Sequence, residues 1–345
     1  MTIFEYIKKY GQITFEEKQI NEIDNLVFSI LAYLDFNEIL KENSNTLEEV
    51  GKKFISRYTL KEISAYGIPQ KDAYNCLKAI KNTTRYKNVQ ILDYIYVGTM
   101  KEQFCAMTFK ITDKLSYIAF EGSDYHMSGW KENFQLSYMY PIPSQIHAIN
   151  YLNNHIKLLG PKIIVGGHSK GGNLALVSAM EMNKLKKNKI IKIYNNDGPG
   201  LRLKEFNSKK YRQIKNKIEH IIPYNSFIGI LLRNDTYKVV DSNRKTVLSH
   251  YPISWLIQED KLKETELKER SKELEKSMIE WLNNHDDIER KKMIENVFNI
   301  FEKCEITDTR KLKKIKYLLK VFKEVKNIDE ETKQLVTSFI SYNFF

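Results

Sequence analysis

The chain has 345 residues, of which 42% are hydrophobic and 12% aromatic, which is enough for a sizeable core and excludes low-complexity disorder. Its 55 Lys and Arg outnumber 43 Asp and Glu, which gives a net charge of +12. This excess is compatible with binding to nucleic acid, to an anionic membrane surface or to an acidic substrate, and also with a compositional bias toward lysine alone. The three cysteines lie far apart, so a disulfide framework and a structural zinc site are not expected. With neither a secretory signal nor a membrane-spanning run, the sequence predicts a soluble, cytoplasmic protein.

Helical patterns dominate residues 1 to about 90, and β-branched and aromatic runs then predict a meander of three strands at 93–99, 103–111 and 115–120. A helix is expected over 144–159, where Gly160-Pro161 stops it. After that, strands and helices alternate. The expected strands are 162–166, 189–194, 220–222 and 237–241, and the expected helices are 173–186 and 203–218. This order predicts an α/β fold with a mixed, mostly parallel central sheet flanked by helices.

From residue 259 the composition changes, because the rest of the chain lacks Gly and Pro and follows helical periodicity. We therefore expect a sheet domain over 1–258 and a charged, amphipathic helical extension over 259–345. The extension has two apolar stripes: Met293, Ile294, Val297, Phe298 and Phe301, and then Leu312, Ile315, Leu319, Phe322 and Val325. Both stripes are expected to pack on each other or on the sheet domain. The alternative is a helix that lies on a membrane or binds a partner.

The segment from Gly167 to Gly171, Gly-His-Ser-Lys-Gly, matches the G-x-S-x-G pattern of a nucleophile elbow. A β-branched strand precedes it and a helix rich in small residues follows it, which is the setting that an elbow needs. Gly167 and Gly171 provide clearance for the tight turn, and the helix N-terminus directs backbone N–H groups toward Ser169. The alternative is a glycine-rich turn without chemistry. The context favours Ser169 as a nucleophile.

A serine nucleophile needs a base and an acid that orients the base. In chain order the acid follows the serine, and the histidine lies in the loop after the last strand. His250 occupies such a loop and is the predicted base. Asp197 comes just after a strand and precedes the rigid turn Gly198-Pro199-Gly200, so it is the predicted acid, with Asp241 as the reserve candidate.

Two backbone N–H groups are expected to stabilise the negatively charged oxygen of the tetrahedral intermediate. One belongs to Lys170, the residue after the nucleophile. The other is assigned to Ser123, because Phe120-Glu121-Gly122-Ser123 ends the third strand of the meander. The alternative for Ser123 is an ordinary Gly-Ser turn.

These segments together resemble the class 3 (fungal-type) lipases and, more closely, an uncharacterised bacterial family of lipase-like α/β-hydrolases. The resemblance rests on Phe120–Ser123 with Trp130, on 167–175 and on 197–200. For the bacterial family it extends to 24–27, 223–229, Ser249-His250 with Trp255, Trp281 and Val297-Phe298. It implies an α/β-hydrolase fold and a serine esterase or lipase reaction on Ser169 and His250, without metal or organic cofactor.

The chain departs from class 3 lipases at two places. Glu121 stands where those enzymes usually have Arg, which we expect to affect local support more than the reaction. Their catalytic Asp lies in the segment that matches Asn225-Ser226, and neither of these residues can serve as the acid. Asp197 or Asp241 must therefore replace it, or activity is impaired.

The expected function is hydrolysis of a carboxylic ester, with an acyl ester or lipid as substrate. The alternative is a catalytically weak module that binds lipid or protein and retains the fold. Thioesterase, acyltransferase and peptidase reactions share the same machinery, nucleic acid is not an expected partner, and the oligomeric state is not predicted. Residues 184–217 carry 12 basic and 2 acidic residues, whereas residues 259–345 are neutral overall. This distribution predicts a basic face near the site that favours an anionic membrane surface or an acidic ester.

Overall fold

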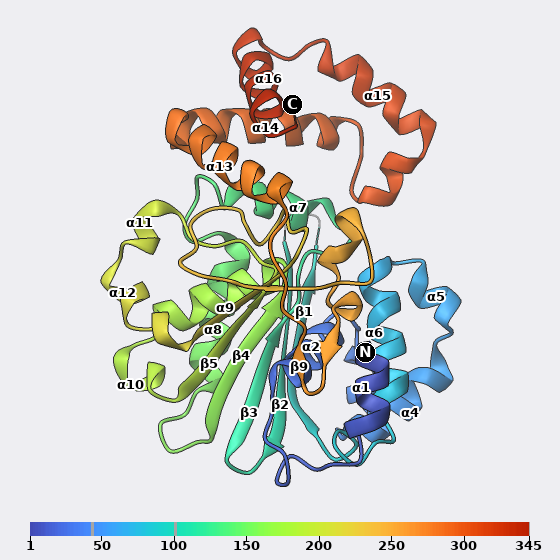
Figure 1. Cartoon of the computed structure of the whole chain (residues 1–345). Coiled ribbons are helices and arrows are strands. Elements are labelled where there is room, and N and C mark those ends of the chain that lie inside the picture. The colour runs from blue at the N-terminus through green and yellow to red at the C-terminus, as the bar shows by residue number, and fades with distance from the viewer. Residues whose placement is uncertain (43–44, 100–101, 345) are drawn as a thin grey trace.

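The computed structural model describes residues 1–42, 45–99 and 102–344, and its centre is a seven-stranded sheet (Figure 1). The strands are β1 (Gln90–Gly98), β2 (Gln103–Thr112), β3 (Leu115–Phe120), β4 (Lys162–His168), β5 (Ile190–Asn196), β6 (Ile218–Pro223) and β7 (Lys238–Val240). Neighbours in the sheet follow chain order; β1–β3 pair antiparallel and β3–β7 parallel. The mixed, mostly parallel sheet predicted from the sequence is confirmed.

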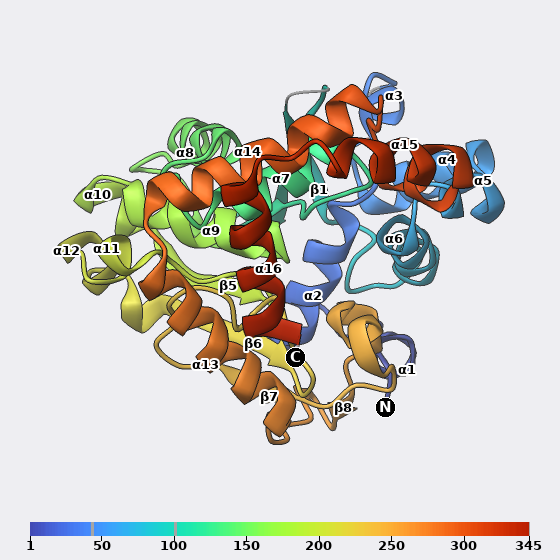
Figure 2. The ribbon, with the colours of Figure 1, turned by 90° about the horizontal axis from the view of Figure 1, so that it is seen from above.

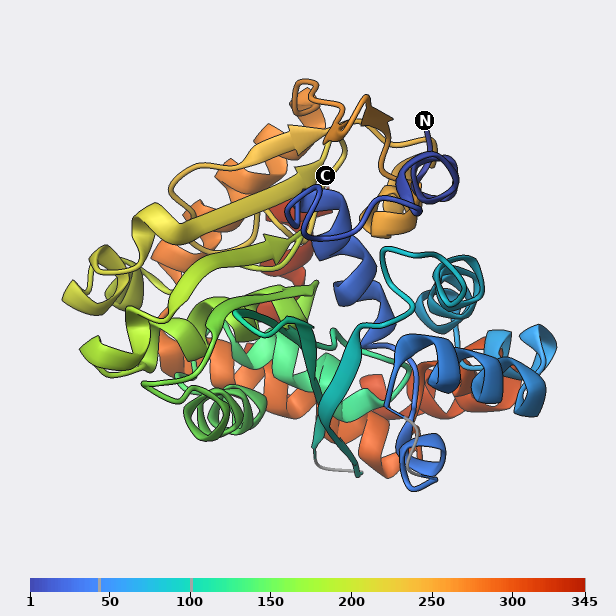
Figure 3. The ribbon, with the colours of Figure 1, turned by 90° about the horizontal axis from the view of Figure 1, so that it is seen from below.

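The N-terminal helices cover one face of the sheet (Figure 3). They are α1 (Ile3–Tyr10), α2 (Glu22–Leu31), α3 (Asn37–Leu40), α4 (Leu47–Arg57), α5 (Leu60–Ser64) and α6 (Ile68–Ile80). Helix α2 lies against the sheet, and nearly all its residues are therefore buried. Asn21 caps its first turn. Beneath the end of β4, Asn25 of α2 bonds Asn196 of β5 (Nδ2–Oδ1, 2.9 Å), so a polar contact positions the helix within an apolar layer.

Helices α8 (Pro143–His155) and α9 (Lys170–Glu181) cover the other face and build a second apolar core with the sheet. The helix expected over 173–186 divides into α9 and α10 (Lys184–Lys187). The expected helix over 203–218 is wrong. The segment instead forms three short elements: α11 (Leu203–Phe206), α12 (Lys209–Arg212) and the 3-10 turn η1 (Lys215–Lys217). Ser208 caps α12, so a new helix begins after it.

Two groups of helices, one that follows β3 and one at the C-terminus, lie at the edge of the sheet where the parallel strands end (Figures 1 and 2). Helix α7 (Met127–Gln135) follows β3 and was not expected. The 3-10 turns η2 (Thr246–His250) and η3 (Pro252–Ser254) and the hairpin β8 (Ile257–Gln258)–β9 (Lys261–Leu262) lead to the C-terminal helices. These are α13 (Glu269–Asn284), α14 (Asp287–Lys303), α15 (Ile315–Val325) and α16 (Glu330–Phe344), with the 3-10 turn η4 (Thr309–Lys313) before α15. The hairpin crosses the expected boundary at 258/259.

The two apolar stripes of the C-terminal extension differ in their surroundings. Met293, Ile294 and Phe298 of the first stripe are buried with Trp281. Most of the second stripe, from Ile315 to Val325, is exposed, which contradicts the expected packing.

Candidate active site

Ser169 lies at the sharp turn between β4 and α9, with φ 58° and ψ −131°. Positive φ in a serine is a strained conformation that the neighbouring packing must enforce. A Cβ at Gly167 would clash with the Gly171 carbonyl, and a Cβ at Gly171 would clash with the carbonyl oxygen of Phe120. Both glycines are therefore required by the close approach of three backbone segments, as the sequence pattern indicates.

Asp197 and His250 meet at the same edge of the sheet. Asp197 follows β5 directly, is fully buried, and its Oδ2 lies 2.6 Å from Nδ1 of His250. The other oxygen, Oδ1, accepts hydrogen bonds from the Ser226 hydroxyl (2.5 Å) and the Gly229 backbone N–H (3.0 Å). Donors to both oxygens hold the carboxylate in one orientation, with one oxygen directed at the imidazole.

The reserve acid, Asp241, has different partners. Its side chain pairs with Lys263 (2.7 Å) and accepts a hydrogen bond from the backbone N–H of Ser242 (2.8 Å). Between the two candidates, Asp197 is the one that contacts His250. Sequence analysis had excluded Ser226 as the acid but did not anticipate that its hydroxyl supports Asp197.

His168 links the elbow to the histidine loop. Its ring lies 4.3 Å from that of His250 (centroid to centroid), and its Nε2 is 2.8 Å from the backbone oxygen of His250. Since a carbonyl only accepts, Nε2 carries the proton, and Nδ1 accepts from the Tyr33 hydroxyl at 2.8 Å. Burial and the neighbouring His250 hold the pKa of His168 well below its usual value, so this ring is neutral.

These contacts bring the His250 loop to the elbow, although no hydrogen bond among the described residues joins Ser169 to His250. In unliganded enzymes such a bond is often long and tightens when substrate binds.

The two predicted oxyanion donors belong to segments that pass close to Ser169. Lys170 is the first residue of α9, so its backbone N–H has no acceptor within the helix. A Cβ added at Gly122 would lie 3.1 Å from Cβ of Ser169, which shows how closely the loop containing Ser123 passes the elbow. The Ser123 hydroxyl donates to the Gly129 carbonyl and accepts from Asn133 (2.9 Å), and both contacts fix this loop to α7.

The side chain of Lys170 is fully buried. Its Nζ bonds Oε2 of Glu132 (2.8 Å) and Oε1 of Gln103 (2.7 Å), and thereby ties α9 to α7 and β2. The Gln103 amide in turn donates to Glu121 (3.0 Å). Burial raises the pKa of Glu121 well above its usual value, and Asp124 adds to this shift.

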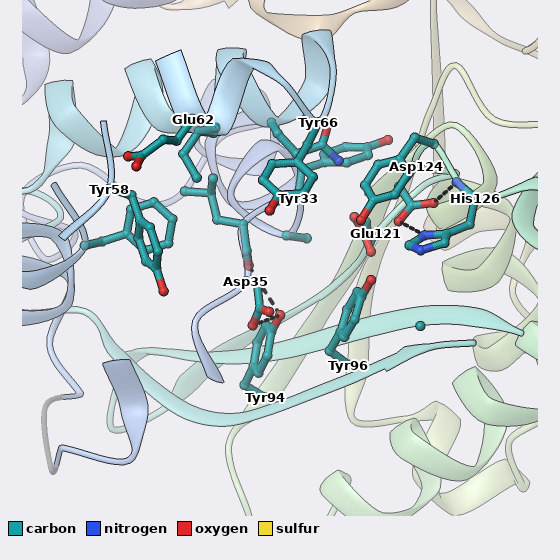
Figure 4. A pocket seen from close by; sticks show the side chains of 17 residues that line it. Tyr33, Asp35, Tyr58, Glu62, Tyr66, Tyr94, Tyr96, Glu121, Asp124 and His126 are labelled. Carbon is teal, nitrogen blue, oxygen red and sulfur yellow. Dashed lines mark hydrogen bonds and ion pairs between the residues drawn. The ribbon is translucent and has the colours of Figure 1, made fainter. Parts of the chain in front are cut away.

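A cavity of about 580 Å³ adjoins this site (Figure 4). Tyr33 and Glu121 line it, and a Cβ at Gly122 would meet both the Tyr33 hydroxyl and Ser169, whereas Ser169, Asp197 and His250 are not among the described residues that line the cavity. Its other polar and aromatic lining residues are Asp35, Phe54, Tyr58, Glu62, Tyr66, Gln70, Tyr94, Tyr96, Asp124, Tyr125 and His126. Neither Lys nor Arg is among the described residues that line it.

Two further observations concern metals and membranes. Within 1–42, 45–99 and 102–344, no group of three or more His, Cys, Asp or Glu side chains is arranged to hold a metal ion. In the same part of the chain, no helix is long and apolar enough to cross a bilayer.

The sheet, the strand–turn–helix around Ser169 and the flanking helices define an α/β-hydrolase fold. The chain belongs to the Mbeg1-like family, whose model matches residues 80–299, and this places it among lipase-like hydrolases related to the class 3 lipases. No curated protein matches the chain. Among solved structures, a crystal structure of M37 lipase is similar at 17% identity over 61% of this chain and 70% of that chain, with a TM-score of 0.39.

Proposed function

We propose that this protein is a serine hydrolase that cleaves carboxylic esters through an acyl-enzyme on Ser169. The observation that carries the proposal is the 2.6 Å contact between Asp197 and His250 at the sheet edge where Ser169 occupies its strained turn. Serine, histidine and a buried carboxylate converging from three loops are the parts of an acyl-transfer site. A structural histidine would not require a fully buried carboxylate held by two further donors.

In the proposed reaction, Nε2 of His250 takes the proton of Ser169 as its Oγ attacks the ester carbonyl. Asp197 keeps Nδ1 protonated and stabilises the imidazolium that forms. The backbone N–H groups of Lys170 and Ser123 donate to the oxyanion. His250 then returns the proton to the leaving alcohol, and a water activated by the same histidine releases the acid from Ser169.

The cavity beside Tyr33 favours particular substrates. Its lining contains the carboxylates of Asp35, Glu62 and Asp124 and neither Lys nor Arg among the described residues, and Figure 4 shows polar oxygens around its space. An anionic group would be repelled there, so the ester part bound in this cavity is neutral or cationic. This argues against the acidic ester suggested by the net charge, whereas an acyl ester with a neutral alcohol fits.

The test is hydrolysis of short p-nitrophenyl esters by the wild type and three variants. Ser169→Ala should abolish turnover, and Asp197→Asn should lower kcat by about 10⁴-fold, because the amide favours the wrong imidazole tautomer. Asp241→Asn is the matched control and should retain wild-type activity. A folded wild type without turnover would favour the alternative, a module that binds lipid or protein without catalysis.

A further inference from the structure

Helix α15 presents an apolar stripe to solvent. The exposed fractions are 75% for Ile315, 65% for Leu319, 68% for Phe322 and 42% for Val325. These positions recur every three or four residues and therefore lie along one face of the helix. Exposed leucines are common singly, but a continuous face of large apolar side chains marks an interaction surface.

The helix packs on the protein with a different face. Tyr317 and Val321 contact the apolar cluster of Ile300, Cys304 and Ile306. The larger apolar stripe therefore remains outside after α15 has docked on the protein, and something other than the described residues must cover it.

Basic residues border the exposed stripe. From Lys311 to Lys326 the sequence has seven lysines and one acidic residue, Glu324. Lys316, Lys323 and Lys326 are exposed, and Lys320 reaches Glu305 at 3.1 Å. An apolar stripe between lysines matches an anionic lipid surface, where acyl chains accept the stripe and phosphates accept the ammonium groups. A second copy of the same face would bring lysines against lysines.

We propose that α15 docks this protein on an anionic lipid surface, with Leu319 and Phe322 inserted and the lysines at the head groups. The helix has 11 residues and therefore lies in the plane of the interface. The contacts before α15 give this docking a direction. Thr309 N–H donates to the Tyr125 carbonyl (2.9 Å), Arg310 lies 4.0 Å from the Tyr125 ring, and Tyr125 lines the cavity that Tyr33 and Glu121 also line.

Docking through α15 therefore brings the cavity rim to the lipid. Delivery of a lipid ester in this way rests on the proposed function, whereas binding of α15 to lipid does not.

The basic segment 184–217 is not the docking surface in this proposal. Three of its lysines form ion pairs, Lys192 with Glu219, Lys210 with Glu181 and Lys215 with Asp235. Lys217 donates to the Lys187 and Ile190 carbonyls, at the start of β5 and thus at the edge opposite Asp197. An anionic partner bound by Lys217 and its neighbours would contact the molecule away from the site.

The test is co-sedimentation of the full chain with vesicles of phosphatidylcholine, with and without phosphatidylglycerol, at low and high salt. Wild type should bind the anionic vesicles and release them at high salt. The double variant Leu319→Ser/Phe322→Ser should bind at least about tenfold more weakly, and Lys316→Gln/Lys323→Gln/Lys326→Gln about a hundredfold.

The matched controls are Leu159→Ser, a fully exposed leucine before β4, and Lys184→Gln/Lys204→Gln/Lys209→Gln in the basic segment. Both should bind like wild type. Equal binding to neutral and anionic vesicles, unchanged binding by the α15 variants, or a dimer that Phe322→Ser dissociates would overturn the proposal. Ser169→Ala should bind vesicles normally, and the α15 variants should hydrolyse soluble esters normally, so the two proposals fail independently.

Discussion

Asp197 receives its three hydrogen bonds from segments that are distant in sequence but adjacent at the sheet edge. Its place after a strand and before a rigid turn was enough to select it from the sequence. The donors Ser226 and Gly229 come from the loop after β6, and the bond between His168 and Tyr33 connects the elbow to the turn after α2. These three contacts were not predictable, because each depends on how two segments approach in space.

The buried His220 leads to a prediction about how the stability of the fold depends on pH. It lies buried in β6, and burial lowers its pKa to about 4. The unfolded chain takes up this proton below pH ~6.5, whereas the folded protein does not, so stability falls as pH drops from 6.5 toward 4. Replacing His220 by Phe should reduce this dependence by about 1.4 kcal/mol per pH unit, measured by urea unfolding across the window.

The comparison between variant and wild type matters because Glu121 acts in the opposite direction. Its raised pKa gives stability at low pH that is lost as pH rises through that pKa. This contribution is common to both proteins and cancels in the difference. An identical pH dependence of His220→Phe and wild type would show that His220 is not kept neutral in the fold.

At the scale of elements, α7 explains how the elbow is held. Glu132 of α7 and Lys170 of α9 form an ion pair with side chains almost entirely buried. The Ser144 backbone N–H also donates to Glu132 (3.0 Å), so this carboxylate connects α7, α8 and α9. Such a buried ion pair fixes the relative position of the helices more than it adds to the net free energy of unfolding. Removal of one partner, however, leaves the other charge buried without a counter-charge.

Glu132→Gln should therefore destabilise the protein by about 3–5 kcal/mol in urea unfolding. The double variant Glu132→Gln/Lys170→Met removes both charges and should recover much of that loss. Glu38→Gln, at an exposed pair with Lys41, is the matched control and should unfold like wild type. Equal losses in the single and double variants would mean that Lys170 does not depend on Glu132 for its charge balance.

The elements also show which patterns carry information. The strands were predictable because buried apolar runs are bounded by turns. Helix α7 was not, since its burial is inverted: Trp130 and Phe134 are exposed at 42% and 40%, whereas Glu132 is buried. The expected helix at 203–218 is interrupted at Asn207-Ser208, where Ser208 caps the start of a new helix. Apolar periodicity alone does not reveal such an interruption.

At the scale of the whole molecule, the net charge of a segment does not show where its charged residues lie. The extension from residue 259 is neutral in total, and this hid the lysine-rich stretch from Lys311 to Lys326 that borders an apolar stripe. The extension also lies across the edge of the sheet that carries Ser169, Asp197 and His250 (Figure 2). Surface recognition and the proposed chemistry therefore share one side of the molecule.

The central claim is that Ser169 is an activated nucleophile, and fluorophosphonate labelling followed by peptide mass spectrometry tests it most directly. The account predicts a single covalent adduct on Ser169, absent in Ser169→Ala and formed much more slowly in Asp197→Asn. Asp241→Asn should label at the wild-type rate. A folded wild-type protein that remains unlabelled, or is labelled at another residue, would contradict the account.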